Sequence, residues 1–274
     1  AIVAPLAEEL AKASVFILVA TGARKLELTS LTDHIFYAGI CALGFAFVEN
    51  LGYFALSSSA GEFVVMALVR TGFGVFGHPL YTTATAVGIW AWRTKGGLWK
   101  AAVGYIAACL LHGLWNGGPT LLAGSLGLDD TGQLAAMILV YIVLFVPVFI
   151  GTIIMTTRNR RNEYEAVRSQ LPLMVEAGLV TPAEADMIAD PRKRRAILAD
   201  SGKYGRVAKR NQKRTITAAT EAALAQHRIA AGEGGPELVK RRDQLSEWLR
   251  SRPDKLGQLP LMPQFPPIQP PATW

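Results

Sequence analysis

Cysteine is scarce in this sequence. Only Cys41 and Cys109 occur in 274 residues, and both lie inside apolar stretches. Cysteines in such places act most often as small buried hydrophobes, so a disulfide framework is excluded as the basis of the fold. A cleavable signal peptide is also lacking, because Ala1 opens directly into a helical pattern with no basic segment before it. The chain does not open on Met, and we expect further membrane-spanning helices ahead of Ala1.

Charge is unevenly distributed along the chain. Residues 1–157 hold 7 Lys/Arg and 8 Asp/Glu, whereas residues 158–274 hold 21 and 13, which together give the net charge of +7. The chain is 51% hydrophobic, and its mean hydropathy of +0.27 is unusual for a soluble protein. This pattern predicts an all-α fold: a polytopic membrane helix bundle over 1–157 and a mostly helical, basic cytoplasmic extension over 158–252. The proline-rich tail 253–274 favours an extended or disordered end.

Five apolar stretches are long enough to span a bilayer, which takes about 20 residues. They are residues 3–21, 33–57, 62–92, 98–118 and 134–156. The third is too long for one straight crossing, and its glycines, with Pro79, predict a kink or a break. Lys and Arg in short loops mark the cytoplasmic side, which places Arg24-Lys25, residues 93–100 and residues 158–161 inside. The loops 57–62 and 117–133 carry acids but no Lys or Arg, so we expect them outside, with five crossings in all.

Polar clusters interrupt four of the predicted helices. They are Glu8-Glu9 with Lys12, Glu49-Asn50, His78, and His112 with Asn116. Ionisable groups are costly in lipid and usually face a site, a pore or one another. At a rise of about 1.5 Å per residue, all four clusters lie roughly 18–24 Å from the inner boundary. Unrelated polar residues would have no reason to share one depth, so we expect the clusters to converge in the outer half of the membrane.

Each cluster also has a purely structural interpretation. Acids favour the first turn of a helix, and a lone Glu49 or an intramembrane histidine can simply bond to a neighbouring helix. Two histidines with three acids at one depth favour a functional site instead. Glu8 and Lys12 share a helix face, so Lys12 can neutralise one acid and leave another carboxylate to act as a base on water.

The sequence of the basic extension predicts helices but no specific function. Residues 159–178, 203–230 and 236–251 are helix-like, and Thr181, Pro182 and Glu184 have the spacing of a helix start. The runs 192–195 and 209–214 most simply contact anionic lipid on the cytoplasmic side. No motif or aromatic pattern indicates nucleic-acid binding.

In order, the motifs E-E-x-x-K, F-x-x-x-E-N, G-H and H-x-x-x-N resemble those of the PrsW family of bacterial intramembrane proteases over roughly residues 4–118. That family looks related to the CAAX-prenyl and bacteriocin-processing membrane proteases. The resemblance implies a peptidase of the bacterial cell membrane that cuts single-pass membrane proteins such as anti-sigma factors. It places catalytic roles on the residues of the motifs: Glu8, Glu9, Glu49, His78, His112 and Asn116.

Two mechanisms remain open. In one, His78, His112 and Glu49 hold a divalent metal, with zinc expected, and another glutamate deprotonates the bound water. In the other, Glu8 or Glu9 activates water directly, while His112 and Asn116 stabilise the oxyanion. The motif H-E-x-x-H, which would indicate zinc, is absent. Two further functions are a haem carrier ligated by both histidines and a proton-coupled transporter, which the lack of an evident inverted repeat disfavours.

Overall fold

The computed structural model describes residues 2–22, 28, 30–72, 74, 76–233 and 235–252. Every regular element among these residues is helical, so the predicted all-α class is confirmed. The chain divides into two compact units, Ala1–Arg160 and Arg161–Trp274. Arg24-Lys25, used for the predicted orientation, and the proline-rich tail 253–274 lie outside the described residues.

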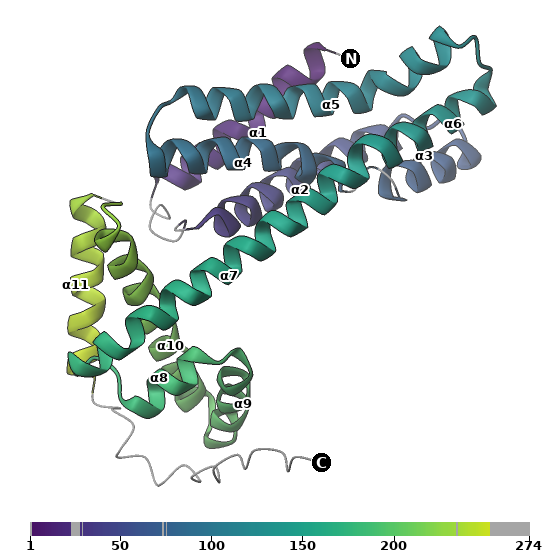
Figure 1. Cartoon of the computed structure of the whole chain (residues 1–274). Coiled ribbons are helices and arrows are strands. Elements are labelled where there is room, and N and C mark those ends of the chain that lie inside the picture. Colours follow the sequence, from purple (N-terminus) through teal and green to yellow (C-terminus); the bar gives the residue numbers. More distant parts are fainter. Residues whose placement is uncertain are drawn as a thin grey trace, which may run out of the picture. The chain divides into compact units, whose positions relative to one another are not determined.

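The first unit contains the helices that carry the polar clusters (Figure 1). Its elements are α1 (Val3–Thr21), α2 (Leu31–Ala55), α3 (Ala60–Gly72), α4 (Gly77–Lys95), α5 (Trp99–Ser125), α6 (Asp130–Val140), the π-helical turn η1 (Tyr141–Phe145) and the first part of α7 (Val146–Glu176). A capping box begins α2: the Ser30 hydroxyl accepts from the Asp33 backbone, and the Asp33 carboxylate accepts from the Ser30 backbone.

Three helical stretches of the described chain are long and apolar enough to cross a membrane: Leu31–Ala55, Ala60–Lys95 and Thr131–Glu176. Large apolar side chains such as Phe36 and Ile142 are more than half exposed on them, which suits contact with lipid and not with water. The molecule is therefore a membrane helix bundle. The charged α1 and the polar-interrupted α5 are not among the three, so the count of five crossings stays a prediction.

The break predicted within residues 62–92 is confirmed. Helix α3 ends at Gly72 and α4 begins at Gly77. Pro79 lies in the first turn of α4. Backbone N–H groups of the first turn have no acceptor within the helix, so a proline there costs no hydrogen bond. The break therefore places His78 at the very start of α4, next to the positive end of that helix's dipole.

One predicted helix end is wrong. The stretch predicted to end at residue 118 is longer, because α5 continues to Ser125 with Pro119 inside it. The helix predicted over 159–178 is confirmed as the last part of α7, which runs to Glu176. Packing against neighbouring helices stabilises a helix across a proline that an isolated segment would not tolerate.

Helices α4 and α5 lie side by side in Figure 1, and their backbones come into contact at two glycines, Gly88 and Gly104. A Cβ built on Gly104 would lie 2.5 Å from the carbonyl oxygen of Ala84 and 2.9 Å from the Cα of Gly88. Small residues let membrane helices pack backbone to backbone, which replaces the hydrophobic driving force that lipid removes. This contact fixes the spacing between the helices that carry His78 and His112.

The second unit has its own core, formed by the end of α7 with α8 (Pro182–Ala189), α9 (Pro191–Ser201), a 3-10 turn η2 (Gly202–Tyr204), α10 (Arg206–Ala230) and α11 (Pro236–Ser251). The predicted helix start is confirmed: Thr181 caps α8 and Glu184 completes a capping box. The buried Glu184 carboxylate also pairs with Arg252, just beyond α11. Helix α9 was not predicted from the sequence.

We predict that Gly104→Ala destabilises the bundle by about 1–3 kcal/mol, because the added methyl group meets backbone atoms that cannot rotate away. The matched control is Gly124→Ala in the same helix, where a Cβ has no neighbour within 4 Å. Denaturation of the purified protein in mixed detergent micelles measures both. Equal stability of the two variants would contradict the close contact.

Candidate active site

The central carboxylate of the site belongs to Glu9 on α1, whose side chain is fully buried. Its Oε1 accepts a hydrogen bond from Lys12 Nζ at 2.7 Å and lies 2.9 Å from His112 Nδ1 on α5. Its Oε2 accepts from Thr82 Oγ1 on α4 at 3.1 Å. Each oxygen therefore has a donor, and a single side chain joins α1 to both α4 and α5.

Lys12 is the buried cation of the site, with 2% of its surface exposed. Its Nζ lies 2.7 Å from Glu9 Oε1, 2.8 Å from His78 Nδ1 and 3.9 Å from Glu8 Oε2. It also lies 4.4 Å from the centre of the Phe45 ring. The sequence predicts that Lys12 neutralises an acid of the Glu-Glu pair. The structure shows that its close partner is Glu9, three residues before it, and not Glu8, which shares its face at four.

Glu49 on α2 is held by two donors. Its Oε2 accepts from Arg70 Nη2 at 2.6 Å and lies 2.9 Å from His78 Nε2. The neighbouring Asn50 accepts from Arg70 Nε at 2.6 Å, and the guanidinium lies 3.7 Å from the centre of the Tyr53 ring. Arg70 and Asn50, to which the sequence assigns no definite role, therefore fix the position of the Glu49 carboxylate.

The hydrogen-bond partners determine which nitrogen of each imidazole carries the proton. An ammonium only donates, so His78 Nδ1 accepts from Lys12 and His78 Nε2–H donates to Glu49. A carboxylate only accepts, so His112 Nδ1–H donates to Glu9. In a neutral His112 the lone pair is then on Nε2, which lies 3.7 Å from Glu8 Oε2.

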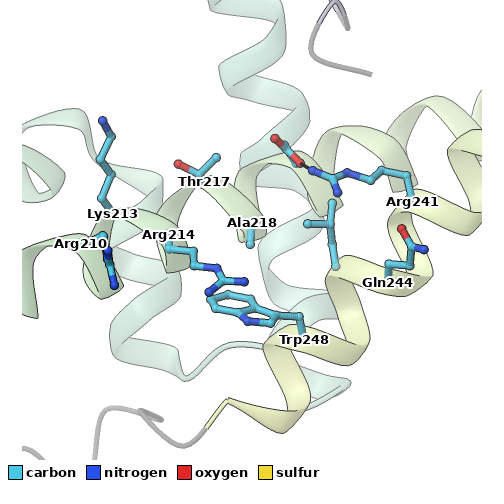
Figure 2. A pocket seen from close by; sticks show the side chains of 10 residues that line it. Arg210, Lys213, Arg214, Thr217, Ala218, Arg241, Gln244 and Trp248 are labelled. Carbon is cyan, nitrogen blue, oxygen red and sulfur yellow. Dashed lines mark hydrogen bonds and ion pairs between the residues drawn. The ribbon is translucent and has the colours of Figure 1, made fainter. Parts of the chain in front are cut away.

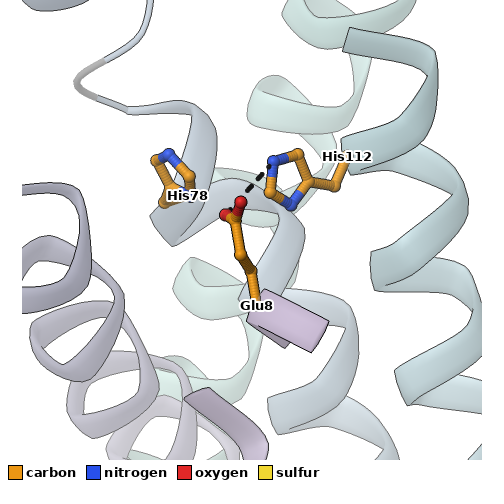
Figure 3. Close-up of side chains that lie close together, drawn as sticks. All are labelled: Glu8, His78 and His112. Atoms are coloured by element: carbon orange, nitrogen blue, oxygen red, sulfur yellow. Dashed lines mark ion pairs between the residues drawn. The ribbon is translucent and has the colours of Figure 1, made fainter. Parts of the chain in front are cut away.

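Glu8, His78 and His112 form a group whose donor atoms all lie within 4.8 Å of one another. Figure 3 shows the Glu8 carboxylate reaching between the two imidazole rings. Glu8 Oε2 is buried and has no hydrogen-bond partner in the described part of the chain. A carboxylate oxygen and an imidazole lone pair that face each other with no proton between them repel, unless a cation lies between them. The pair therefore fits a metal ion, since two ligands of a tetrahedral zinc lie roughly 3.4 Å apart.

The hydrogen bond between His112 and Glu9 also supports a metal ion at this place. A histidine that binds a metal usually donates its other N–H to a carboxylate, which fixes the ring and its tautomer. His112 makes this contact with Glu9. His78 fits less simply, because Lys12 and Glu49 already contact both of its nitrogens. With neutral imidazoles, Glu8, Glu9 and Glu49 exceed the cations Lys12 and Arg70 by one negative charge, which also favours a bound cation.

Two cavities adjoin the cluster. The smaller, of about 70 Å³, is lined by Glu49, His78, His112 and Asn116 among others, so it brings the exposed Asn116 to the histidines. This volume holds a water molecule or two. The larger, of about 210 Å³, has mostly apolar walls from α4, α5, η1 and α7, and Trp115 borders both cavities.

Tyr81 is a site residue that the sequence analysis missed. Its ring stacks on His112 with centroids 4.8 Å apart and meets His78 edge-on at 5.7 Å. It is 1% exposed, its hydroxyl has no hydrogen-bond partner among the described residues, and it lines the larger cavity. Its position three residues after His78 is the signal that was available, because such residues share a helix face.

The structure therefore brings five of the six predicted site residues within contact of one another: Glu8, Glu9, Glu49, His78 and His112. Asn116 joins them only across the small cavity. The carboxylate grouped with the two histidines is Glu8, whereas the sequence analysis assigned Glu49 to the metal. The assignment of Glu49 stays a prediction, and the geometry favours Glu8.

Fold and cluster together define a helical membrane protein with a buried carboxylate–imidazole site. The family model described as PrsW family intramembrane metalloprotease matches residues 1–152, more than half of the chain, and the chain belongs to this family. The protein is accordingly a peptidase, and its family implies a divalent metal. The match extends past the motifs through α6 and η1 into α7. No curated protein and no solved structure matches the chain significantly.

We predict that Lys12→Met destabilises the protein by about 3–5 kcal/mol, because it leaves the buried Glu9 without its cation. Adding Glu9→Gln to this variant should restore most of the loss, since the remaining amide carries no charge. Unfolding in detergent micelles compares the two variants with the exposed control Lys95→Met. If the double variant is less stable than Lys12→Met alone, the charge compensation described here is wrong.

Proposed function

We propose that this peptidase cuts a single-pass membrane protein, of the kind that anti-sigma factors represent, near the outer face of a bacterial cell membrane. The carrying observation is the meeting of Glu8, His78 and His112 beside a cavity large enough for water. The matched depth of the polar clusters and the acidic, Lys- and Arg-free loops support an outer position, with the basic extension in the cytoplasm.

Glu8, His78 and His112 would hold the divalent metal, for which we propose zinc. A carboxylate with two imidazoles is a ligand set found in catalytic zinc sites, which keep a further position for water or substrate. When bound, such a metal supplies Lewis acidity that activates water and polarises a peptide carbonyl. To become a ligand, His78 must exchange its contact with Lys12 or with Glu49 for the metal.

Glu49 is the proposed proton acceptor. It lines the small cavity with both histidines, and its contacts with Arg70 and His78 both end on Oε2. Oε1 remains to take a proton from water in that cavity. Glu9 has a different role, because both of its oxygens already accept hydrogen bonds. It is a positioning residue that orients His112.

The larger cavity is the proposed place for an apolar substrate side chain next to the cleaved bond. Its aromatic and aliphatic walls suit a residue of a transmembrane segment. The Tyr81 hydroxyl and the Asn116 amide would then donate to the peptide carbonyl on which negative charge develops. The buried, unpartnered state of the Tyr81 hydroxyl supports this role, since such a group is costly without a partner.

The two alternative functions fit the site poorly. The cavity between the histidines, about 70 Å³, is far too small for a porphyrin, and the imidazole centroids lie only 5.1 Å apart. A haem carrier would also give the three glutamates no role. A proton-coupled transporter would use the same acids, but membership in a peptidase family favours hydrolysis.

Three substitutions separate the proposed roles. We predict that Glu8→Gln and His112→Ala lose both the bound metal and cleavage, whereas Glu49→Gln keeps the metal and loses cleavage by a factor on the order of 10²–10⁴. Metal content of the purified protein is measured by mass spectrometry. Cleavage is measured on a single-pass protein that is shortened only in cells containing this peptidase.

The control is Glu62→Gln, which removes an exposed acid of α3 and should change neither property. Metal retained at the wild-type level in Glu8→Gln, or lost in Glu49→Gln, would reverse the two assignments. Cleavage by the His112→Ala variant at the normal rate would remove His112 from the catalytic site.

Tyr81→Phe tests the proposed donor. The variant keeps the ring that stacks on His112 and loses only the hydroxyl, so we predict a fall in kcat on the order of 10²-fold with KM and metal content nearly unchanged. An unchanged kcat would show that the hydroxyl does not act in the transition state. A loss of metal would instead indicate that it supports His112.

A further inference from the structure

The largest of the three cavities described here lies in the second unit, far along the chain from the peptidase residues. It has a volume of about 500 Å³ and lies between α10 and α11. Figure 2 shows side chains of both helices around it. This volume falls within the range of small-molecule sites, roughly 300–1,000 Å³.

Cations dominate the wall that α10 provides. Arg210, Lys213 and Arg214 are spaced by three and four residues, so they share one face of the helix. None of the three forms an ion pair or a side-chain hydrogen bond with another described residue. Like charges at this spacing repel and weaken a helix, so this arrangement stabilises nothing by itself.

The opposite wall leaves the positive charge uncompensated. Arg241 of α11 lines the cavity and pairs with Glu221 of α10 at 2.8 Å. Glu221 is the single acid among the lining residues, and its charge is cancelled by Arg241. The three cations of α10 therefore give the cavity a net charge of +3.

The three cations of α10 are exposed to solvent, and the remaining lining residues give the cavity an apolar floor and fix one of these cations. The Arg214 guanidinium lies 4.6 Å from the centre of the Trp248 ring, which restricts its orientation. Buried Leu245 and Ala218 form an apolar base, and Thr217 and Gln244 add uncharged polar groups. A convex surface of basic residues would not have an apolar floor of this kind.

We propose that this cavity binds a phosphate group of a ligand that carries at least two negative charges. Guanidinium groups bind phosphate oxygens in pairs, and a lysine adds a compact point charge. The phosphate can belong to a free phosphorylated compound or to the headgroup of an anionic phospholipid. This local site differs from the diffuse attraction of basic runs to a lipid surface, which needs no cavity.

The test is calorimetric titration of the full-length protein in a neutral detergent. One arm adds sodium pyrophosphate and the other adds dihexanoyl phosphatidic acid, with dihexanoyl phosphatidylcholine as the lipid without net charge. Binding of pyrophosphate identifies a soluble phosphate ligand, and binding of phosphatidic acid alone identifies a lipid headgroup. Either result supports the site, and the absence of binding in both arms overturns it.

A charge-matched pair of double variants shows where an anion binds. Arg210→Gln with Lys213→Gln should weaken binding by about a hundredfold, because each of the two lost charge-assisted hydrogen bonds accounts for roughly a factor of ten. The control, Arg192→Gln with Arg195→Gln, removes the same charge from the exposed surface of α9 and should change affinity less than about threefold. Equal weakening by both pairs would show nonspecific attraction and overturn the site.

Discussion

The contact of the Lys12 ammonium with Glu9 and His78 is the interaction on which the candidate site depends. The ammonium lies inside a membrane helix bundle, within 3 Å of both the Glu9 carboxylate and the His78 ring. Without it, three carboxylates would share one apolar region with only Arg70 to balance them, and such an arrangement is strongly unfavourable in lipid. With it, Glu9 is neutralised and free to orient His112. The contact between Lys12 and Glu9 thus both compensates a buried charge and leaves Glu9 in place to orient the His112 ring.

This balance explains why the three acids are not equivalent. Glu9 has a donor on both oxygens, and Glu49 is held through one oxygen by Arg70 and His78. Glu8 is left with a buried oxygen that has no hydrogen-bond partner within the described ranges, and its nearest cation, Lys12 Nζ, lies 3.9 Å away. Buried carboxylate oxygens usually have a donor, because each unmade hydrogen bond is costly. The oxygen of Glu8 that faces the His112 lone pair therefore supports the proposed metal site.

Much of the fold and the membership of the site could be predicted from the sequence. Apolar length located three helical stretches able to cross a membrane, glycines located the break between α3 and α4, and the rarity of ionisable groups in lipid identified the polar clusters. The predicted end at residue 118 was wrong, because Pro119 is held inside α5 by tertiary packing that no local signal records. The sequence also could not predict which side chains of the site pair with each other. Glu8 and Glu9 differ by one residue, and only the rotation of α1 against α4 and α5 decides which carboxylate bonds to Thr82 and His112 and which lies near His78.

The central claim is that Glu8 and two imidazoles meet around one metal ion. X-ray absorption spectroscopy of the purified protein at the metal edge tests this directly, because it reports the number and type of ligands. We predict two imidazole nitrogens with the remaining ligands oxygen, and loss of the metal signal in His78→Ala as in His112→Ala. A coordination shell containing sulfur, or one that is unchanged when either histidine is removed, would contradict the account.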